Sequence, residues 1–450
     1  MVAQNRNTHK KKHKHRKRRN HLATFLCTLT GIVILGVVLI IGLKWNMNRK
    51  LYDSAETGEM DEAEEQAALE EFFRNREAIP EEFTAPVEPV PEVKDNEEIK
   101  EEEIAKSKYA DQITDTAYLE ANNIHVRSMN PEHENEVTLT FAGDILLDSE
   151  YSVAATLIQS GGNIETSIDP ALLSIMRSSD IMMLNNEFPY SDGGTPTEGK
   201  QYTFRAATER VHYLDDMGVD IVSIANNHAY DYGQQAFLDT LDTLEKDEMP
   251  YVGGGRNIDE ASRPVYFIIG DIKVGFLSAT QIERTDSPDT KGATDSSPGV
   301  FRCWNNERLL KKIGEVKQNC DFLVVYIHWG TESTTEIDWA QQKQAPEMQQ
   351  AGADLIIGDH PHILQPISAI NGVPVFYSLG NFWFNSKEID TCLVQATIGT
   401  DGIHSLKFIP ALQSGCRTRL LTGGEASRVI NEVQAMSPKV HIDGEGYISY

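Results

Sequence analysis

Six short polar blocks, each at the end of an apolar run, constrain this chain more than any other feature. They are Gly143-Asp144, Asn186-Glu187, Asn226-Asn227-His228, His328-Trp329-Gly330, His360-Pro361-His362 and Gly380-Asn381. The apolar runs have the length and composition of buried parallel strands. Because α/β folds assemble their sites at the carboxyl ends of such strands, we expect the blocks to meet in one site.

From about residue 136 onward, apolar runs alternate with polar, helix-like segments. The runs predict strands at 137–142, 181–184, 221–225, 265–269, 274–279, 322–327, 355–357 and 375–379. The segments between them predict helices at 154–159, 170–177, 207–217, 234–246, 305–318 and 340–351. This alternation predicts an α/β domain whose largely parallel sheet is covered on both faces. Residues 392–398 and 403–409 predict closing strands at one sheet edge.

The first residues of the chain have a different composition. Residues 6–19 contain nine Lys and Arg, and the uncharged stretch 22–43 that follows is long enough to cross a bilayer as a helix. It runs into Lys44 and Trp45 rather than a small-residue cleavage site, which favours an uncleaved anchor over a signal peptide. The excess of basic residues before the span predicts a cytoplasmic N-terminus, anionic lipids as partners of the basic tail, and an extracytoplasmic remainder.

The composition divides the chain into a basic tail at 1–21, a transmembrane helix at 22–43, an acidic, largely disordered stalk at 44–135, a domain at 136–384 and a strand-rich extension of that domain at 385–450. Residues 51–108 hold 20 Asp and Glu against six Lys and Arg. The formal net charge of the whole chain is −27, so we expect no broad basic face and no nucleic-acid partner. The five cysteines show no Cys-x-x-Cys spacing, which argues against a thiolate zinc site.

The early blocks supply oxygen donors and a proton donor. Asp144 and Glu187 each place a carboxylate at a strand end, although a single acid there is more often a turn residue or a solvated loop acid. The side-chain oxygen of Asn227 is a neutral metal ligand, His228 beside it can donate a proton, and Asp231 can orient that imidazole. The alternative is a helix N-terminus capped by one of the asparagines.

The late histidines are the strongest signal for a metal. His328 follows one buried run, and His360 and His362 follow another, where the His-x-His spacing lets two imidazoles converge on one metal pair. A lone histidine is usually structural, but three at two strand ends make that interpretation weaker. We expect Gln365 and Asn381 to line the same region.

The order of these motifs resembles the CapA family of capsule or poly-γ-glutamate synthesis proteins over about residues 137–384. The matching motifs are Gly-Asp, Asn-Glu, Asn-Asn-His-Ala-x-Asp-x-Gly, His-Trp-Gly-x-Glu, Gly-x-His-Pro-His-x-x-Gln and Ser-Leu-Gly-Asn-Phe. The resemblance implies a calcineurin-like metallophosphoesterase fold, which is a four-layer α/β sandwich, with one or two divalent ions. Mixed His, Asn and carboxylate ligands do not distinguish Mn, Zn, Fe and Mg.

Carried over position by position, the resemblance implies metal ligands at Asp144, Glu187, Asn227, His328, His360 and His362. It implies a general acid at His228, oriented by Asp231. Substrate-contacting or supporting roles are implied for Asn186, Asn226, Glu332, Gln365 and Asn381. One departure matters, because the wider superfamily begins with Asp-x-His and this chain has Leu146 in place of that imidazole. We therefore expect one metal position to be weak or absent unless Asn226 or Glu332 compensates.

These observations predict a membrane-anchored, metal-dependent hydrolase that acts in synthesis, release or export of an anionic polymer, with poly-γ-glutamate favoured. Metal ions would activate water for attack on a phosphorus or carbonyl centre, and His228 would protonate the leaving group. The sequence has no Gly-x-x-x-x-Gly-Lys-Ser/Thr loop, so chain elongation would belong to membrane-bound synthase partners. Two alternatives stay open: a non-catalytic assembly or polymer-binding subunit, and a general extracytoplasmic phosphodiesterase.

Overall fold

The computed structural model describes residues 101–130, 133, 135–282 and 290–450. The predicted basic tail at 1–21, the predicted span at 22–43 and residues 44–100 of the predicted stalk lie outside these ranges. Within them, no helix combines the length and the apolar character that crossing a membrane requires. The described residues all belong to one structural unit, residues 83–450.

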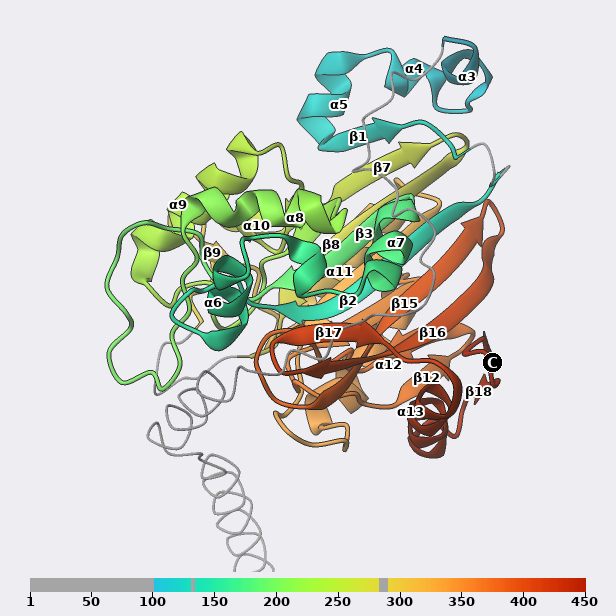
Figure 1. The fold of residues 1–450 in the computed structure, drawn as a ribbon. Coiled ribbons are helices and arrows are strands. Elements are labelled where there is room, and N and C mark those ends of the chain that lie inside the picture. Colours follow the sequence, from blue (N-terminus) through green and yellow to red (C-terminus); the bar gives the residue numbers. More distant parts are fainter. Residues whose placement is uncertain (1–100, 131–132, 134, 283–289) are drawn as a thin grey trace, which may run out of the picture. The chain divides into compact units, whose positions relative to one another are not determined.

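An eight-stranded sheet contains the first strands of the domain, in the order β17-β16-β15-β2-β3-β4-β5, with β14 paired to β2 (Figure 1). Its strands are β2 (Val137–Ile145), β3 (Ile181–Asn186), β4 (Ile221–Ser223), β5 (Tyr251–Val252), β14 (Asn381–Trp383), β15 (Ile389–Gly399), β16 (Gly402–Ser414) and β17 (Arg417–Leu420). Strands β2 to β5 run parallel. The antiparallel strands β15 to β17 extend the sheet beyond β2, which agrees with the closing strands expected there.

A seven-stranded sheet follows the order β1-β7-β8-β10-β11-β13-β12. Its strands are β1 (Ile124–Arg127), β7 (Val265–Ile269), β8 (Ile272–Thr280), β10 (Phe322–His328), β11 (Leu355–Asp359), β12 (Ile367–Ile370) and β13 (Val373–Phe376). Strands β8, β10, β11 and β13 are parallel neighbours. Their connections contain the helices that cover this sheet.

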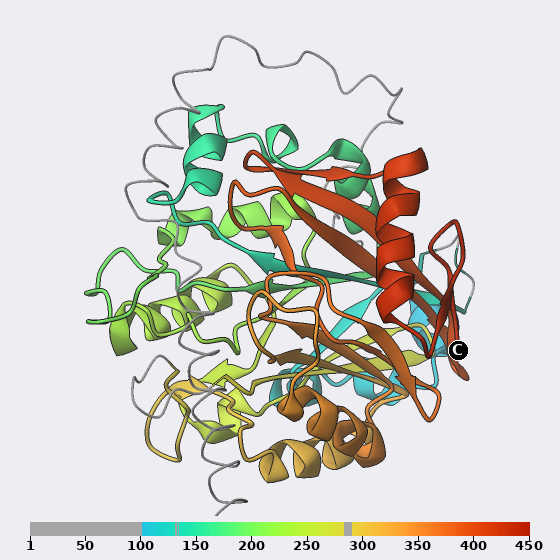
Figure 2. The same cartoon turned by 90° about the horizontal axis from the view of Figure 1, so that it is seen from below.

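Helices cover one face of each sheet, and the other two faces pack together (Figure 2). The helices over the eight-stranded sheet are α6 (Ser152–Gln159), α7 (Pro170–Ser178), α8 (His212–Met217) and α9 (Gly233–Lys246). Those over the seven-stranded sheet are α10 (Ile258–Ala261), α11 (Glu307–Lys317) and α12 (Trp339–Ala351). The layers therefore run helix, sheet, sheet, helix.

Strand β10 shows why the central runs contain almost no polar residues. Val324 and Tyr326 point into the core between the sheets, whereas Val325 and Ile327 point into the core under α11 and α12. Because successive side chains of a strand alternate between its two faces, a strand buried on both sides is apolar throughout. The strand becomes polar only at His328, where it reaches the end of the sheet.

The alternation of strands and helices predicted one sheet covered on both faces, and this prediction is wrong. The strands divide between two sheets that bury one face against each other. A pattern of apolar runs cannot distinguish these arrangements, because a second sheet and a helix layer both exclude water. The four layers agree with the mixed α/β sandwich that the motif resemblance implied.

Part of the predicted disordered stalk is folded. Residues 101–127 form α3 (Glu101–Lys106), α4 (Ala110–Ile113), α5 (Thr116–Asn122) and the edge strand β1, which pairs parallel with β7. Ile113 and Leu119 pack on the core under α11, and the hydroxyl of Tyr109 donates to Asp321 at 2.7 Å. The acidic composition ends before these apolar residues, so the predicted boundary at 135 is too late.

The C-terminal region contains more than the expected strands. After β17, the helix α13 (Gly423–Met436) inserts Val429, Ile430 and Val433 into the core between the sheets. The short hairpin of β18 (His441–Ile442) and β19 (Ile448–Ser449) follows. The residues after 384 thus complete the same unit, although the sequence analysis did not predict α13.

Candidate metal centre

The predicted metal ligands lie at the carboxyl ends of parallel strands from both sheets. In the eight-stranded sheet, Asp144 is near the end of β2 and Glu187 directly follows β3. In the seven-stranded sheet, His328 is the last residue of β10, and His360 and His362 follow β11. The two groups meet: a nitrogen of His328 lies 3.4 Å from a Glu187 oxygen, and Nδ1 of His362 lies 3.2 Å from Oδ2 of Asp144.

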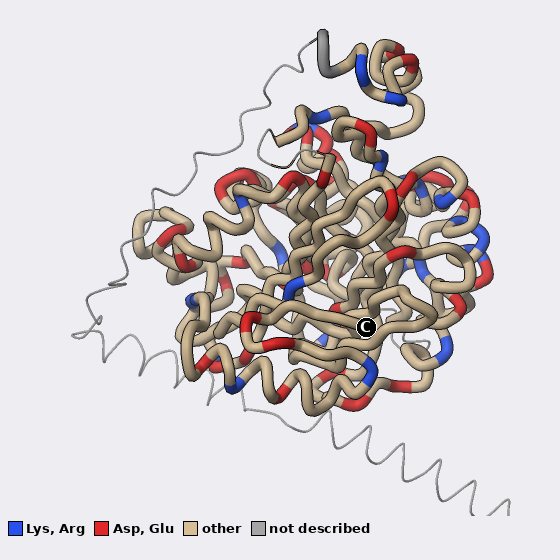
Figure 3. Tube along the Cα trace, turned by 90° about the vertical axis from the view of Figure 1, so that its right-hand side faces the viewer, with Lys and Arg blue, Asp and Glu red and all other residues tan. Residues whose placement is uncertain are grey.

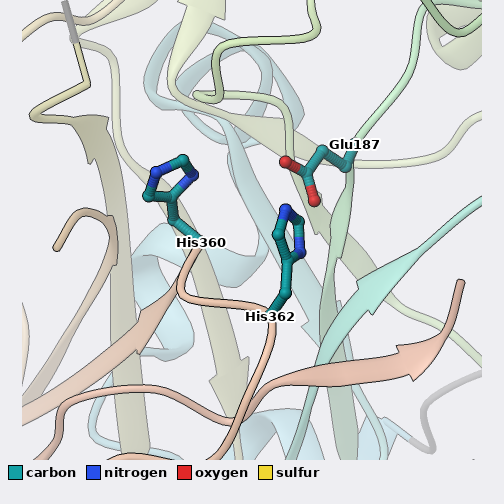
Figure 4. Close-up of side chains that lie close together, drawn as sticks. All are labelled: Glu187, His360 and His362. Atoms are coloured by element: carbon teal, nitrogen blue, oxygen red, sulfur yellow. The ribbon is translucent and has the colours of Figure 1, made fainter. Parts of the chain in front are cut away.

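Glu187, His360 and His362 form one potential metal-binding group (Figure 4). Their ligand atoms all lie within 4.8 Å of one another, and in the figure both imidazoles and the carboxylate face a common space. The φ angles of His360 and His362 are 94° and 60°. Left-handed backbone costs a residue other than glycine roughly 1–3 kcal/mol and is concentrated at functional sites. The backbone of the loop after β11 is therefore strained where it places the two imidazoles side by side.

Asp144, His328 and Asp359 form a second group, and their ligand atoms also lie within 4.8 Å of one another. All three side chains are fully buried. Oδ1 of Asp359 is 2.9 Å from Nδ1 of His328, as the pairing of these two residues between β10 and β11 requires. This group brings two carboxylates into an interior position.

His328 connects the two groups. Its Nε2 is 2.8 Å from Oδ1 of Asn227 and 3.1 Å from Nδ1 of His360, in addition to the 3.4 Å separation from Oε1 of Glu187. Carboxylate, amide and imidazole donors from three different strand ends thus surround one ring nitrogen. The site is continuous, with donors enough for more than one ion.

The buried carboxylates have strongly perturbed acidities. Burial, and then the neighbouring charge of Asp144, raises the pKa of Glu187 well above its usual value. The same two causes raise the pKa of Asp359. Burial also acts on Asp144, but the hydrogen bond and charge of His362 outweigh it and hold the pKa of Asp144 below its usual value. Glu187 and Asp359 therefore resist ionisation, because the protein's own groups compensate their negative charge incompletely.

The three imidazoles differ in pKa because their neighbours differ. Burial lowers the pKa of His328 and His360 well below the ordinary value, so both rings are neutral, the form in which imidazole ligates metals. Burial also acts on His362, but the carboxylates of Glu187 and Asp144 raise its pKa to about 10. In the metal-free protein, His362 is thus the cation that faces these acids.

The donor set fits divalent metal ions. Both carboxylate oxygens of Glu187 and Oδ2 of Asp359 are buried without a hydrogen-bond donor in the described part of the chain. Leaving ionised carboxylates buried and incompletely compensated is costly, and natural proteins pair them or bind metals with them. Ligation by His, Asn and carboxylate groups suits Mn²⁺, Fe²⁺, Zn²⁺ or Mg²⁺. The predicted residues that would hold the ions are Asp144, Glu187, Asn227, His328, His360 and His362.

A second arrangement lies beside the carboxylates and is built on Asp231. Its Oδ2 is 2.6 Å from Nδ1 of His228 and accepts from the amide of Phe204 at 2.7 Å. Its Oδ1 accepts from Nζ of Lys200 at 2.6 Å, and the same ammonium donates to the main-chain oxygen of Asn227 at 2.7 Å. Burial raises the pKa of Asp231 to about 7, even though Lys200 opposes the shift. Asp231 thus contacts the imidazole of His228, the side chain that the motif predicts it to orient.

Residues 138–386 match the bacterial capsule synthesis proteins PGA_cap. The chain belongs to this family. It is 30% identical over 65% of its length to "PGA biosynthesis protein CapA" of Bacillus subtilis, of which 76% is covered. It is 29% identical over 67% of its length to "Capsule biosynthesis protein CapA" of Bacillus anthracis, with 74% of that protein covered. A "Probable polyglutamine synthesis accessory protein" of Mycobacterium tuberculosis is 23% identical over 45% of this chain and 55% of its own length.

The PGA_cap match contains every residue placed in the site. It begins at β2 and ends just after β14, so it covers the strand ends of both sheets. The strands β15 to β17 and the helix α13 lie beyond it. The resemblance to the CapA family inferred from the motifs is confirmed by this match and by the two Bacillus relatives.

Two predicted supporting residues of this PGA_cap chain contact other residues of the site. The side-chain amide of Asn226 donates to the main-chain oxygen of Asn186 at 2.9 Å, and its oxygen accepts from the amide of His228 at 3.1 Å. Oδ1 of Asn381 is 2.8 Å from Nδ1 of His362. The amide of Asn186 instead turns back to a main-chain oxygen of its own loop at 2.7 Å. Asn226 and Asn381 therefore hold site residues in place.

The other two predicted supporting residues lie at different distances from the centre. Glu332 is half-exposed, and its carboxylate is 3.9 Å from Nε2 of His360, at the rim of the site. The oxygen of Gln365 accepts from Gln341 at 2.6 Å, and its amide donates to the main-chain oxygen of Thr334 at 2.9 Å. These contacts fasten the loop that follows β10, so Gln365 supports the fold around the site rather than its donors.

Three site residues were absent from the predicted set. Asp359 directly precedes the predicted ligand His360, and its position at the end of β11 could have identified it. Asn185 donates to Oδ1 of Asp144 at 2.8 Å and lies in the predicted block before Glu187. Lys200 comes from an irregular segment with no pattern that distinguishes it. Only the fold brings its ammonium to Asp231.

Leu146 occupies the position at which the superfamily pattern has an imidazole. Its side chain is 1% exposed and belongs to the apolar core beneath the helices of the eight-stranded sheet. The main-chain amide of Leu146 donates to the oxygen of Trp383 at 3.0 Å, which ties β2 to β14. This position serves packing in the present chain, so an ion near Asp144 needs a different donor.

Proposed function

We propose that this chain is a membrane-anchored, metal-dependent hydrolase that acts in the synthesis, release or export of an anionic capsule polymer, with poly-γ-glutamate as the substrate. The observation that carries the proposal is the convergence of buried carboxylates, imidazoles and an amide oxygen, from the ends of five strands, beside an oriented histidine. Membership of the PGA_cap family and the names of the two Bacillus relatives support the polymer assignment.

Bound divalent ions would supply Lewis-acid activation of water and would neutralise the negative charge of the substrate. The chain's own contribution is proton delivery. Because Nδ1 of His228 faces Asp231, Nε2 is the ring nitrogen that would donate to the leaving group. Lys200 opposes the protonation of Asp231 and holds its carboxylate in place, so the imidazole stays fixed. General acids of this kind contribute roughly 10²- to 10⁴-fold to a rate.

Charge explains why metal ions are needed for an anionic substrate. The net charge of the chain is −27, and in the view of Figure 3 the Lys and Arg residues lie interspersed with Asp and Glu residues. Such a surface does not attract a polyanion. We propose that the ions provide the local positive potential at the site.

The proposed topology has residues 22–43 as a single membrane span, the N-terminus in the cytoplasm near anionic lipids, and the described domain outside the membrane. The length and flanking charges of that segment support this arrangement. Elongation of the polymer belongs to membrane-bound synthase subunits in this proposal, since hydrolysis alone builds no chain.

A second candidate is a non-catalytic assembly or polymer-binding subunit of the synthase complex. The observation in its favour is Leu146, which removes an imidazole from the expected ligand set. The oriented His228 favours catalysis instead, because binding alone requires no proton donor. The two candidates differ in whether metal-loaded protein turns over any substrate.

The test uses the full-length chain in detergent, loaded with Mn²⁺ or Zn²⁺, and compares it with His228→Gln and a control, His404→Gln. His404 is an exposed histidine paired with Asp401. We expect shortening of poly-γ-glutamate by the parent and the control, and a loss of roughly 10²-fold or more in His228→Gln at unchanged metal content. Metal-loaded protein without turnover contradicts the hydrolase and leaves the assembly role. Cleavage of bis(p-nitrophenyl) phosphate with intact polymer indicates a general phosphodiesterase.

A further inference from the structure

Asp359 is the acid of the site that neither the motifs nor the proposed mechanism uses. It is fully buried at the end of β11, and its neighbour on β10 is His328. The register between these strands accounts for the contact of Oδ1 with Nδ1 of His328 at 2.9 Å. It does not account for the other oxygen, Oδ2, which is buried and has no hydrogen-bond donor among the residues that the structure describes.

The orientation of His328 determines which oxygen of Asp359 is engaged. Nε2 of this ring faces Asn227, His360 and Glu187. If Nε2 presents its lone pair to that group, Nδ1 carries the proton and donates to Oδ1 of Asp359. Metal-ligating histidines commonly donate their second nitrogen to a carboxylate in this way. Oδ1 is then occupied, and Oδ2 remains to serve another partner.

The surroundings of Asp359 indicate that partner. Its ligand oxygen lies within 4.8 Å of those of Asp144 and His328, and Asp144 in turn is 3.2 Å from Nδ1 of His362. Two fully buried carboxylates this close are not both ionised unless a cation lies with them, and without a cation they share a proton. Leu146, which would have supplied an imidazole near Asp144, is packed in the apolar core.

We infer that Asp359 is a metal ligand, replacing the imidazole that Leu146 removes and completing a second divalent-ion position with Asp144 and with His362, whose Nδ1 lies 3.2 Å from Asp144. One carboxylate thus has two tasks: Oδ1 orients His328, and Oδ2 binds the ion. This inference rests on the proposed metal site. A position with two carboxylates and one imidazole favours oxygen-preferring ions such as Mn²⁺ over Zn²⁺, compared with one that has two imidazoles.

The variant Asp359→Asn separates the two tasks. Its amide oxygen can still accept from His328, but the amide nitrogen that replaces the other oxygen cannot ligate a cation. Removing a buried negative charge next to Asp144 also removes repulsion in the metal-free chain. We therefore expect the metal-free variant to unfold at a temperature equal to or above that of the metal-free parent.

The experiment measures Mn²⁺ binding to the full-length chain by titration calorimetry and by metal content after gel filtration. We expect two ions per parent chain and one per Asp359→Asn chain. The control is Asp401→Asn, which makes the same change at an exposed aspartate 2.6 Å from His404, and we expect it to keep both ions.

Three results overturn the inference about Asp359 alone. If Asp359→Asn binds two ions with unchanged affinity, Asp359 has only the orienting role. The inference also fails if the parent binds one ion, or if the variant does not fold without metal, which makes Asp359 a structural residue. A parent that binds no Mn²⁺ contradicts the proposed metal site itself. The failure of the inference is thus distinguishable from the failure of the proposed function.

Discussion

The site contains two kinds of buried carboxylate, which differ in whether the protein supplies all of their hydrogen-bond partners. Asp231 is fully buried, and both of its oxygens are occupied, by the ammonium of Lys200 and by the amide of Phe204 together with His228. Glu187 and Asp359 are equally buried, but they retain oxygens that no described donor reaches.

The role of each carboxylate follows from whether its oxygens have hydrogen-bond partners. A carboxylate whose partners are all supplied by the protein is complete without a ligand, and its effect is to fix those partners. A buried carboxylate with unsatisfied oxygens is complete only when something else binds. We therefore assign Asp231 to the orientation of His228 and Glu187 to metal ions, and the two should respond differently to substitution.

The largest effect is expected for Lys200→Met. The substitution leaves Asp231 buried without its cation, and breaking such a pair typically destabilises a protein by about 3–5 kcal/mol. Because Lys200 contacts the main-chain oxygen of Asn227 and none of the donor atoms, Mn²⁺ binding should remain within a few-fold. Urea unfolding and Mn²⁺ titration measure the two quantities. The double variant Lys200→Met/Asp231→Asn should recover part of the stability. If Lys200→Met loses Mn²⁺ binding, the separation of Asp231 from the metal-binding carboxylates is wrong.

The second-largest effect is expected for Glu187→Gln, which should weaken metal binding and leave the stability of the metal-free chain unchanged. Replacing one carboxylate oxygen by an amide nitrogen removes a metal donor, so Mn²⁺ should bind roughly 100-fold more weakly or worse, a loss of about 3 kcal/mol. The metal-free stability should not fall, since neither Glu187 oxygen has a hydrogen-bond donor among the described residues. Glu432→Gln, at an exposed helical position, is the matched control. A variant that is much less stable without metal while binding Mn²⁺ normally would show that Glu187 is structural.

A third effect separates the site from acid sensitivity elsewhere. His125 on β1 stacks on Phe267 with ring centroids 5.3 Å apart, and its Nε2 is buried without a partner among the described residues. Burial, followed by the charges of Arg127 and Arg263, lowers the pKa of His125 to about 4. The unfolded chain protonates this ring near pH 6.5. Between these values the unfolded state binds more protons, so stability is present above pH 6.5 and is lost as the pH falls toward 4.

The expected loss from His125 is about 2 kcal/mol between pH 7 and pH 4.5. The variant His125→Phe keeps the stacking on Phe267 and should remove this part of the pH dependence, which urea unfolding at the two pH values measures. An identical pH dependence in parent and variant would assign the acid sensitivity to other groups, including those of the metal centre.

The smallest effect is expected at the surface. Arg428 forms a two-point ion pair with Asp390, with both distances 2.7 Å, and also approaches Glu432. Exposed pairs of this kind contribute roughly 1 kcal/mol or less because water screens them. Arg428→Ala should therefore change the free energy of unfolding by that amount and leave Mn²⁺ binding unchanged. A loss as large as that in Lys200→Met would mean that burial does not explain the difference between the two pairs.

Most strands and the ligands at their ends could be predicted from the sequence because the signals are local. Val265–Ile269 is an unbroken apolar run and forms β7 with the expected bounds, and each polar block marks the point where a strand leaves the core. The division into two sheets could not be predicted from the apolar runs, because Val324 and Val325 are equally apolar although they face different cores. Only the motif resemblance implied a four-layer sandwich. Local pattern reports burial and does not report which layer covers a residue.

The missed site residues depend on long-range structure. Lys200 lies 31 residues from Asp231 in the sequence and in no regular element, so nothing local connects them. Asp359 was inside a recognised block, but the motif places weight on the histidines that follow it. Its importance becomes visible only when β10 and β11 are aligned and His328 lies beside it. The fold of residues 101–127 was missed because the acidic composition upstream was extended too far.

A measurement of bound divalent metal tests directly whether this site is a metal centre. It uses the full-length chain purified without chelator, and it compares this chain with a His360→Ala/His362→Ala double variant that has been shown to fold. The account predicts near-stoichiometric metal in the parent and its loss in the double variant, because these imidazoles belong to the group around Glu187. A parent chain that stays empty when Mn²⁺ or Zn²⁺ is supplied would contradict it.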